Sequence, residues 1–164
     1  DLINAIKELQ KKKVFLKVLL LGDPDNKNLA SISCNHLKKW SNDKIIEWLP
    51  AQKDVKEYIQ QSKIAVLPSF REGFPKSLLE AASCGLPLIS NNVPGCKEIC
   101  IDGYNGLLVE VNNYLSLSKK IEDLIFDHEL MNRMGNNSRK LVLKNFSEKI
   151  VSNKFLKLYK SIES

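Results

Sequence analysis

Two glutamates flank a short segment of this sequence that could bind an anion. Glu72 comes directly before Gly73, which lets the backbone bend, and Glu80 follows further along the segment. Pro75, between them, suits the first turn of a helix because its missing N–H is not needed there. The first N–H groups of such a helix have no partners inside the helix, and they attract anions, phosphate above all. An ionised carboxylate only accepts hydrogen bonds, so each glutamate should meet hydroxyl groups instead of the phosphate.

The elements expected around this segment place it between a strand and a helix. Residues 64–67 form an apolar run that predicts a strand, and good helix formers from Lys76 onward predict a helix. Gly85 followed by Pro87 is typical of a helix end. Helix side chains lean toward the N-terminus, so Glu80 would reach back toward the loop. A nucleotide-sugar, with a diphosphate between two hydroxyl-rich rings, has the layout that these groups would satisfy.

Residues 72–81, EGFPKSLLEA, resemble the donor motif of the retaining GT-B glycosyltransferases of family 4, in which two glutamates have this spacing. The resemblance continues in the family's order through residues 85–89, 93–98 and 102–109. Either glutamate alone would be better explained as a solvated surface charge. An ordered set of blocks is far more specific than one short motif.

The resemblance implies transfer of a hexose-type sugar from a nucleotide-diphosphate donor, with retention at the anomeric carbon, to a glycan or lipid-linked acceptor. The process it implies is the synthesis of surface polysaccharide or oligosaccharide. Glu72 would be the catalytic residue, holding hydroxyls of the donor sugar, and Glu80 would bind the ribose diol. The donor-binding positions carried over from the motif are Gly73, Phe74, Pro75, Lys76, Ser77, Leu78 and Glu80. The family commonly works without a metal, so we expect no cofactor and no metal ligand.

Two parts of the family pattern are not found in this sequence. Family members carry a strand and a basic loop before the helix predicted here over residues 1–13, and an N-terminal domain that binds the acceptor. We therefore expect residues 1–164 to form a single donor-binding domain, a fragment of a larger two-domain enzyme. Without the N-terminal domain as its partner, we expect this chain to be inactive.

Predicted strands and helices alternate along most of the chain. Strands are predicted over residues 14–21, 44–49, 64–67, 87–90 and 106–110, and helices over residues 1–13, 29–40, 53–62, 76–85, 115–126, 129–144 and 147–162. This alternation predicts an α/β fold, a Rossmann-like doubly wound parallel sheet followed by C-terminal helices. The apolar stripe of the last helix, from Val151 to Ile162, is predicted to pack in the core or against another domain.

Ligands of such sheets bind beyond the carboxyl ends of the strands. The loops at those ends are residues 22–24, 49–51, 69–75 and 91–95. We therefore expect these four loops to lie along one edge of the molecule, with the glutamate segment among them.

The composition is that of an ordinary globular protein, with 43% hydrophobic and 27% charged residues. The net charge of +6 does not indicate a nucleic-acid partner, because the lysines are dispersed and not interleaved with aromatic residues. Weak attraction to anionic lipid fits the family better and predicts a cytoplasmic protein, peripheral on the inner face of the membrane, where a lipid-linked acceptor could be met. Cys34, Cys84, Cys96 and Cys100 show no metal-ligand pairing and are expected as free thiols.

Two other functions are compatible with a doubly wound sheet. A nucleotide-sugar epimerase shares the fold, but the two-glutamate block argues against it. A non-catalytic nucleotide- or phosphate-binding module, such as a receiver-like domain, would need an acidic pocket after the first strand. Asp23 and Asp25 are the only hint of one, and the glycine and proline blocks would have no purpose there.

Overall fold

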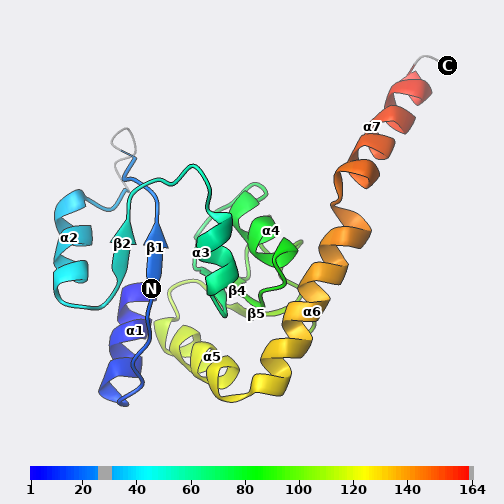
Figure 1. Ribbon diagram of the computed structural model, residues 1–164. Helices are drawn as coiled ribbons and strands as arrows, with labels where there is room; N and C mark the ends of the chain where they lie inside the picture. Colours follow the sequence, from blue (N-terminus) through cyan, green and yellow to red (C-terminus); the bar gives the residue numbers. More distant parts are fainter. Residues whose placement is uncertain (26–30, 163–164) are drawn as a thin grey trace. The chain divides into compact units, whose positions relative to one another are not determined.

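The computed structural model describes residues 1–25 and 31–162 (Figure 1). The chain divides into two compact units, residues 1–55 and residues 56–164, and each unit is described by itself. Leu29, which begins the helix predicted over residues 29–40, lies outside the described residues.

In the first unit, two helices accompany two short strands. Its elements are α1 (Leu2–Lys11), β1 (Leu19–Leu21), α2 (Cys34–Asn42) and β2 (Glu47–Leu49). The strands pair in parallel, with Leu19 opposite Glu47. α1 buries Ile6 and Leu9 from its predicted apolar stripe, and α2 buries Leu37. The predicted parallel pairing and both predicted helices are therefore confirmed in this unit, with shorter bounds.

The buried strand predicted over residues 14–21 is wrong in its length and its burial. Only Leu19–Leu21 form β1, and all three residues are half-buried. Before them the exposure alternates, and Phe15 is 75% exposed. A run of leucine and β-branched residues favours extended backbone, but a ladder also needs a partner strand, and β2 offers only three residues opposite.

The second unit contains a parallel sheet of three strands and five helices among the described residues. Its elements are α3 (Lys56–Gln61), β3 (Ala65–Leu67), α4 (Lys76–Ser83), β4 (Leu88–Asn91), β5 (Gly106–Val109), α5 (Tyr114–Phe126), α6 (His128–Asn145) and α7 (Glu148–Ile162). The strand order is β3-β4-β5, and the central strand β4 is buried along its whole length. A strand flanked on both sides and covered on both faces is expected to be apolar, as Leu88 and Ile89 are, whereas Ser90 and Asn91 at its end are buried polar residues.

Helix α4 is fixed to this sheet by its apolar face. Leu78, Ala81 and Ala82 are buried, and they join one apolar cluster with Leu88 and Ile99. These three positions recur at helical spacing, so a single face of α4 enters the core. The opposite face is left for other contacts.

Helix α7 forms as predicted; of the two kinds of packing predicted for its apolar stripe, packing in the core is not found, and packing against another domain stays a prediction. None of its residues is buried, and Phe155, Leu158 and Ile162 are 56%, 56% and 73% exposed. In Figure 1, α7 continues outward from the end of α6. The predicted amphipathic helix is present, but its apolar stripe does not pack in the core of the second unit.

Candidate functional site

The N-terminal end of α4 presents backbone N–H groups without acceptors. Pro75 occupies the N-cap position and makes no side-chain capping hydrogen bond. Leu79 N donates to Pro75 O at 3.4 Å, which closes the first turn. The N–H groups of Lys76, Ser77 and Leu78 have no acceptor among residues 1–25 and 31–162. An anion at this position would therefore meet hydrogen-bond donors that the protein has left open.

The exposed face of α4 carries the polar side chains predicted for the site. Leu78 points into the core, so only its N–H is available to a ligand. Lys76, Ser77 and Glu80 are exposed, and positions three and four apart share one helix face. No ion pair joins Lys76 to Glu80 in the part of the chain that the structure describes. The Glu80 carboxylate is therefore available to a ligand.

The loop before α4 carries Glu72 and is held at its far end by aromatic packing. Glu72 is half-buried and forms no ion pair within the described residues, and Gly73 is exposed. The Phe74 ring meets the Phe146 ring edge to face, with centroids 5.4 Å apart. Pro75 is buried. The Phe74 side chain is therefore held at one edge by Phe146 and remains 46% exposed, so both its ring and its backbone stay open to the donor role that the motif implies.

The start of the same loop is fastened to strand β4. The Ser90 hydroxyl donates to Leu67 O at 2.8 Å, and the Asn91 side-chain amide donates to Ser69 O at 3.1 Å. Both side chains are 1% exposed. Sequence reasoning gave Ser90 and Asn91 no role, although two polar residues at the end of an apolar strand were the available signal.

The buried cysteines Cys96 and Cys100 are in their protonated forms at neutral pH. Burial raises the pKa of the Cys96 thiol; a hydrogen bond to Ser90 opposes this, and the carboxylates of Glu72 and Glu98 raise the pKa further. Burial also raises the pKa of Cys100 to about 12. Because a thiolate is the nucleophilic form of cysteine, neither residue is suited to nucleophilic chemistry. All four cysteines are free, as the sequence predicted.

In the first unit, the loop that follows β1 contacts the end of β2. Gly22 N donates to Leu49 O at 3.0 Å, and the Trp48 indole N–H donates to Gly22 O at 2.8 Å. Within each unit, therefore, the loop after one strand contacts the carboxyl end of its neighbour. That all four loops share one edge stays a prediction.

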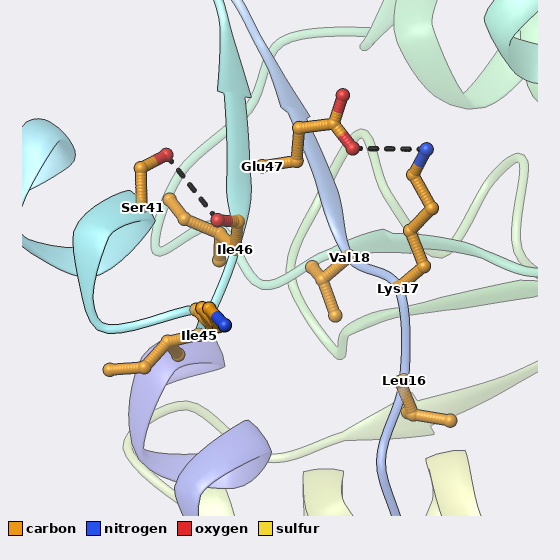
Figure 2. Close-up of a pocket in the computed structure, with 8 residues that line it drawn as sticks. Leu16, Lys17, Val18, Ser41, Ile45, Ile46 and Glu47 are labelled. Atoms are coloured by element: carbon orange, nitrogen blue, oxygen red, sulfur yellow. Dashed lines mark hydrogen bonds and ion pairs between the residues drawn. The ribbon is translucent and has the colours of Figure 1, made fainter.

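A separate pocket of about 310 Å³ lies in the first unit, where its two strands begin (Figure 2). Its lining residues are Leu16, Lys17, Val18, Ser41, Lys44, Ile45, Ile46 and Glu47. Lys17 and Glu47 form an exposed ion pair at 3.0 Å. The pocket is at the amino ends of the strands, opposite the edge where the predicted loops lie, and it contains none of the predicted site residues.

The described residues contain neither a metal-binding cluster nor a helix that could span a membrane. Within residues 1–25 and 31–162, no three His, Cys, Asp or Glu side chains are grouped so that they could hold a metal ion. None of the described helices has the length and apolar character needed to cross a bilayer.

His36 on α2 is held by packing. Its ring nitrogen Nδ1 shares a hydrogen bond of 3.0 Å with the Ser33 hydroxyl, and the ring stacks on Trp40.

Comparison with known proteins places these features in a family. Residues 1–141 match the family model described as glycosyl transferases group 1. N,N'-diacetylbacillosaminyl-diphospho-undecaprenol alpha-1,3-N-acetylgalactosaminyltransferase of Campylobacter jejuni is 33% identical over 161 residues, covering 95% of this chain and 41% of that protein. The capsular polysaccharide biosynthesis glycosyltransferase CapM of Staphylococcus aureus is 28% identical, covering 97% of this chain and 41% of that protein. The chain thus spans about two fifths of the length of these relatives.

The fold is also found among solved structures. HepE of Anabaena, solved in complex with UDP, superposes with a TM-score of 0.86 over 98% of this chain and 44% of that chain, at 18% identity. This likeness confirms the predicted Rossmann-like α/β fold class. Together with the family match over residues 1–141, it leads to one conclusion: the chain belongs to the group 1 glycosyl transferases.

Proposed function

We propose that this chain is the donor-binding part of a retaining glycosyltransferase that moves a hexose-type sugar from a nucleotide diphosphate to a glycan or lipid-linked acceptor. The observation that carries the proposal is the open N-terminal end of α4, where the N–H groups of Lys76, Ser77 and Leu78 have no acceptor in the described residues. Glu72 precedes this end and Glu80 follows it on the exposed helix face. In a group 1 glycosyl transferase, Glu72 would then meet the sugar of the donor, the open N–H groups its diphosphate, and Glu80 its ribose.

The division of roles follows from the chemistry of each group. Backbone N–H groups and the N-terminal end of the α4 dipole would hold the diphosphate, and they would stabilise the charge that grows on it as the sugar leaves. Glu72 would accept hydrogen bonds from the donor sugar, and Glu80 from the ribose diol. The Lys76 ammonium and the Ser77 hydroxyl lie on the first turn of α4, where both could donate hydrogen bonds to a bound phosphate.

The acceptor is assigned to another part of the protein. The two relatives are more than twice as long as the matched region, and their names give a diphospho-undecaprenol acceptor for one and capsular polysaccharide synthesis for the other. We infer that this chain works with an N-terminal acceptor domain at the cytoplasmic face of a membrane, in the synthesis of surface glycans. On this view residues 1–164 alone bind the donor weakly and do not turn over.

Titration of UDP and GDP against the chain, by calorimetry, tests the nucleotide site. UDP is the first probe because the protein with this fold from Anabaena was solved with it. Glu80→Ala should weaken binding of the preferred nucleotide by roughly tenfold, because two hydroxyl-to-carboxylate hydrogen bonds are lost. Glu129→Ala is the control, since Glu129 is an exposed glutamate on α6. Equal affinities for the parent chain and Glu80→Ala would remove Glu80 from the site.

Three further measurements test the remaining parts of the proposal. Addition of EDTA should leave nucleotide affinity unchanged, because N–H groups and not a metal ion are proposed to hold the phosphates. With the full-length enzyme, the anomeric configuration of the product, read by NMR, should be that of the donor sugar. Turnover of a nucleotide-sugar onto an acceptor by residues 1–164 alone would contradict the assignment of the acceptor to another domain.

A further inference from the structure

The loop that carries Glu72 is held by the loop that follows β4. β3 and β4 are parallel neighbours, with Leu67 opposite Ser90, so the segments that follow the two strands leave the sheet at the same edge. The buried Asn91 side chain then donates its amide hydrogen to Ser69 O, two residues beyond the end of β3. The first residues of the Glu72 loop are therefore tied to the end of β4.

A second contact lies at Glu72 itself. Gly95 is buried, with a backbone φ of +84°, and its Cα faces the carbonyl groups of Glu72 and Gly73. A methyl group on Gly95 would lie 2.7 Å from Glu72 O and closer still to Gly73 O. Both neighbours are backbone atoms, so they cannot turn aside as a flexible side chain would. Any side chain at position 95 must push these two carbonyl groups, and with them the backbone of Glu72, away.

The N-terminal end of α4 is fixed independently of this contact. Leu78, Ala81 and Ala82 hold the helix in the core, and Phe74 rests on Phe146. A shift of the Glu72–Gly73 peptide would therefore move the Glu72 carboxylate while the open N–H groups of α4 stay in place.

We propose that Gly95 and Asn91 are positioning residues that set where the Glu72 carboxylate lies relative to the N-terminal end of α4. The inference rests on the proposed function, because it concerns how Glu72 meets the donor sugar. Gly95 acts through the backbone carbonyl groups of Glu72 and Gly73, and Asn91 acts through Ser69, so neither needs to touch the donor. The consequence is specific: a change at either position should affect recognition of the sugar and spare recognition of the nucleotide.

Gly95→Ala and Gly103→Ala form a matched pair that tests this consequence. Gly103 has a similar left-handed backbone, with φ of +71°, but a methyl group there would meet no atom within 4 Å. Both variants carry the same backbone strain, and only Gly95→Ala also displaces the Glu72 loop. For the parent and for each variant, calorimetry gives the affinity for UDP and the affinity for one UDP-sugar. That UDP-sugar is the one that binds the parent most tightly among UDP-glucose, UDP-galactose and their N-acetyl forms. The ratio of these two affinities measures the contribution of the sugar.

The expected result is that Gly95→Ala lowers this ratio by roughly tenfold with UDP affinity unchanged, whereas Gly103→Ala keeps the parent ratio. The unfolding midpoint in urea should fall further in Gly95→Ala than in Gly103→Ala, because only Gly95→Ala adds a collision with backbone atoms to the backbone strain. An unchanged ratio in Gly95→Ala, with UDP still bound, would overturn the inference and leave the proposed function standing. Failure of the parent chain to bind UDP, GDP or a sugar derivative of either would overturn both.

Asn91→Ala tests the same inference without introducing an atom. The substitution removes the amide donor to Ser69 O, so the loop is loosened and not pushed. The sugar-dependent ratio should fall in the same direction as in Gly95→Ala, by a smaller factor. If Gly95→Ala does not fold, this variant decides the question: a parent-like ratio in Asn91→Ala would overturn the inference, and a lowered ratio with unchanged UDP affinity would support it.

Discussion

The two ends of helix α4 are built in opposite ways. At the N-terminal end, the N–H groups of Lys76, Ser77 and Leu78 have no acceptor in the described residues. At the C-terminal end, Gly85 continues from the helix with φ of +80°, and the Arg139 guanidinium donates to Ser83 O.

The C-terminal end is also covered by another helix. Gly85 O lies so close to Gly135 of α6 that a methyl group on Gly135 could not fit between them. One end of α4 is therefore satisfied by the protein, and the other is left for a ligand. Since every helix starts with unpaired N–H groups, an end that the protein does not cap is informative only beside ends that it does cap.

The largest expected effect is at the closed end. Gly135→Val should lower the free energy of unfolding by about 2–3 kcal/mol, because its side chain would collide with backbone atoms of Gly85 and separate α6 from α4. Urea unfolding followed by circular dichroism measures the loss. Asn136→Val, at the next and exposed position of α6, is the control and should change stability by a few tenths of a kcal/mol. Similar losses in the two variants would show that the close approach is not what holds the end of α4.

A charge placed at each end of α4 should have opposite consequences. Ser77→Asp adds an anion to the first turn, where it should stabilise the fold by about 0.3–1 kcal/mol and weaken UDP binding by roughly tenfold through repulsion of the phosphates. Ser83→Asp adds the same charge to the last turn, so stability should fall and UDP affinity should stay unchanged. Unfolding curves and UDP titrations of both variants provide the test. Equal UDP affinity in Ser77→Asp and the parent would mean that no phosphate binds at this end.

The sequence predicted the open end of α4 better than it predicted what surrounds it. The turn, Pro75 and the following helix formers are local signals, and α4 begins at Lys76 as expected. The contacts of Asn91 with Ser69 and of Gly95 with Glu72 join residues about twenty positions apart, and they depend on the pairing of β3 with β4. No local pattern encodes such contacts.

Contacts between distant residues also account for the differences between the predicted and the observed β1 and α7. The length of β1 is decided by how much of β2 lies opposite, and not by its own composition. The amphipathic pattern of α7 correctly predicted a helix, but a pattern does not say what covers the apolar face.

Helix α6 offers a comparison between a start that the protein caps and the open start of α4. The Asp127 carboxylate accepts a hydrogen bond from Leu130 N at 2.8 Å, so one N–H group of the first turn of α6 is capped by the protein. Asp127→Ala should lower the free energy of unfolding by about 1 kcal/mol and leave UDP affinity unchanged. Pairing this variant with Ser77→Asp separates structural caps from ligand sites, because the first changes stability alone and the second changes binding. A loss of UDP affinity in Asp127→Ala would contradict that separation.

The smallest expected effect concerns the hydrogen bond that closes the C-terminal end of α4. Arg139 is exposed and donates to Ser83 O, so water can replace much of what the guanidinium provides. Arg139→Ala should therefore lower the free energy of unfolding by only about 0.5 kcal/mol. Arg139→Lys keeps a cation near the last carbonyl groups of α4 and should lose less. UDP titration of both variants should match the parent chain, because this end of the helix faces the protein. A loss of stability in Arg139→Lys equal to or greater than the loss in Arg139→Ala would mean that a cation at this end of α4 contributes nothing to stability.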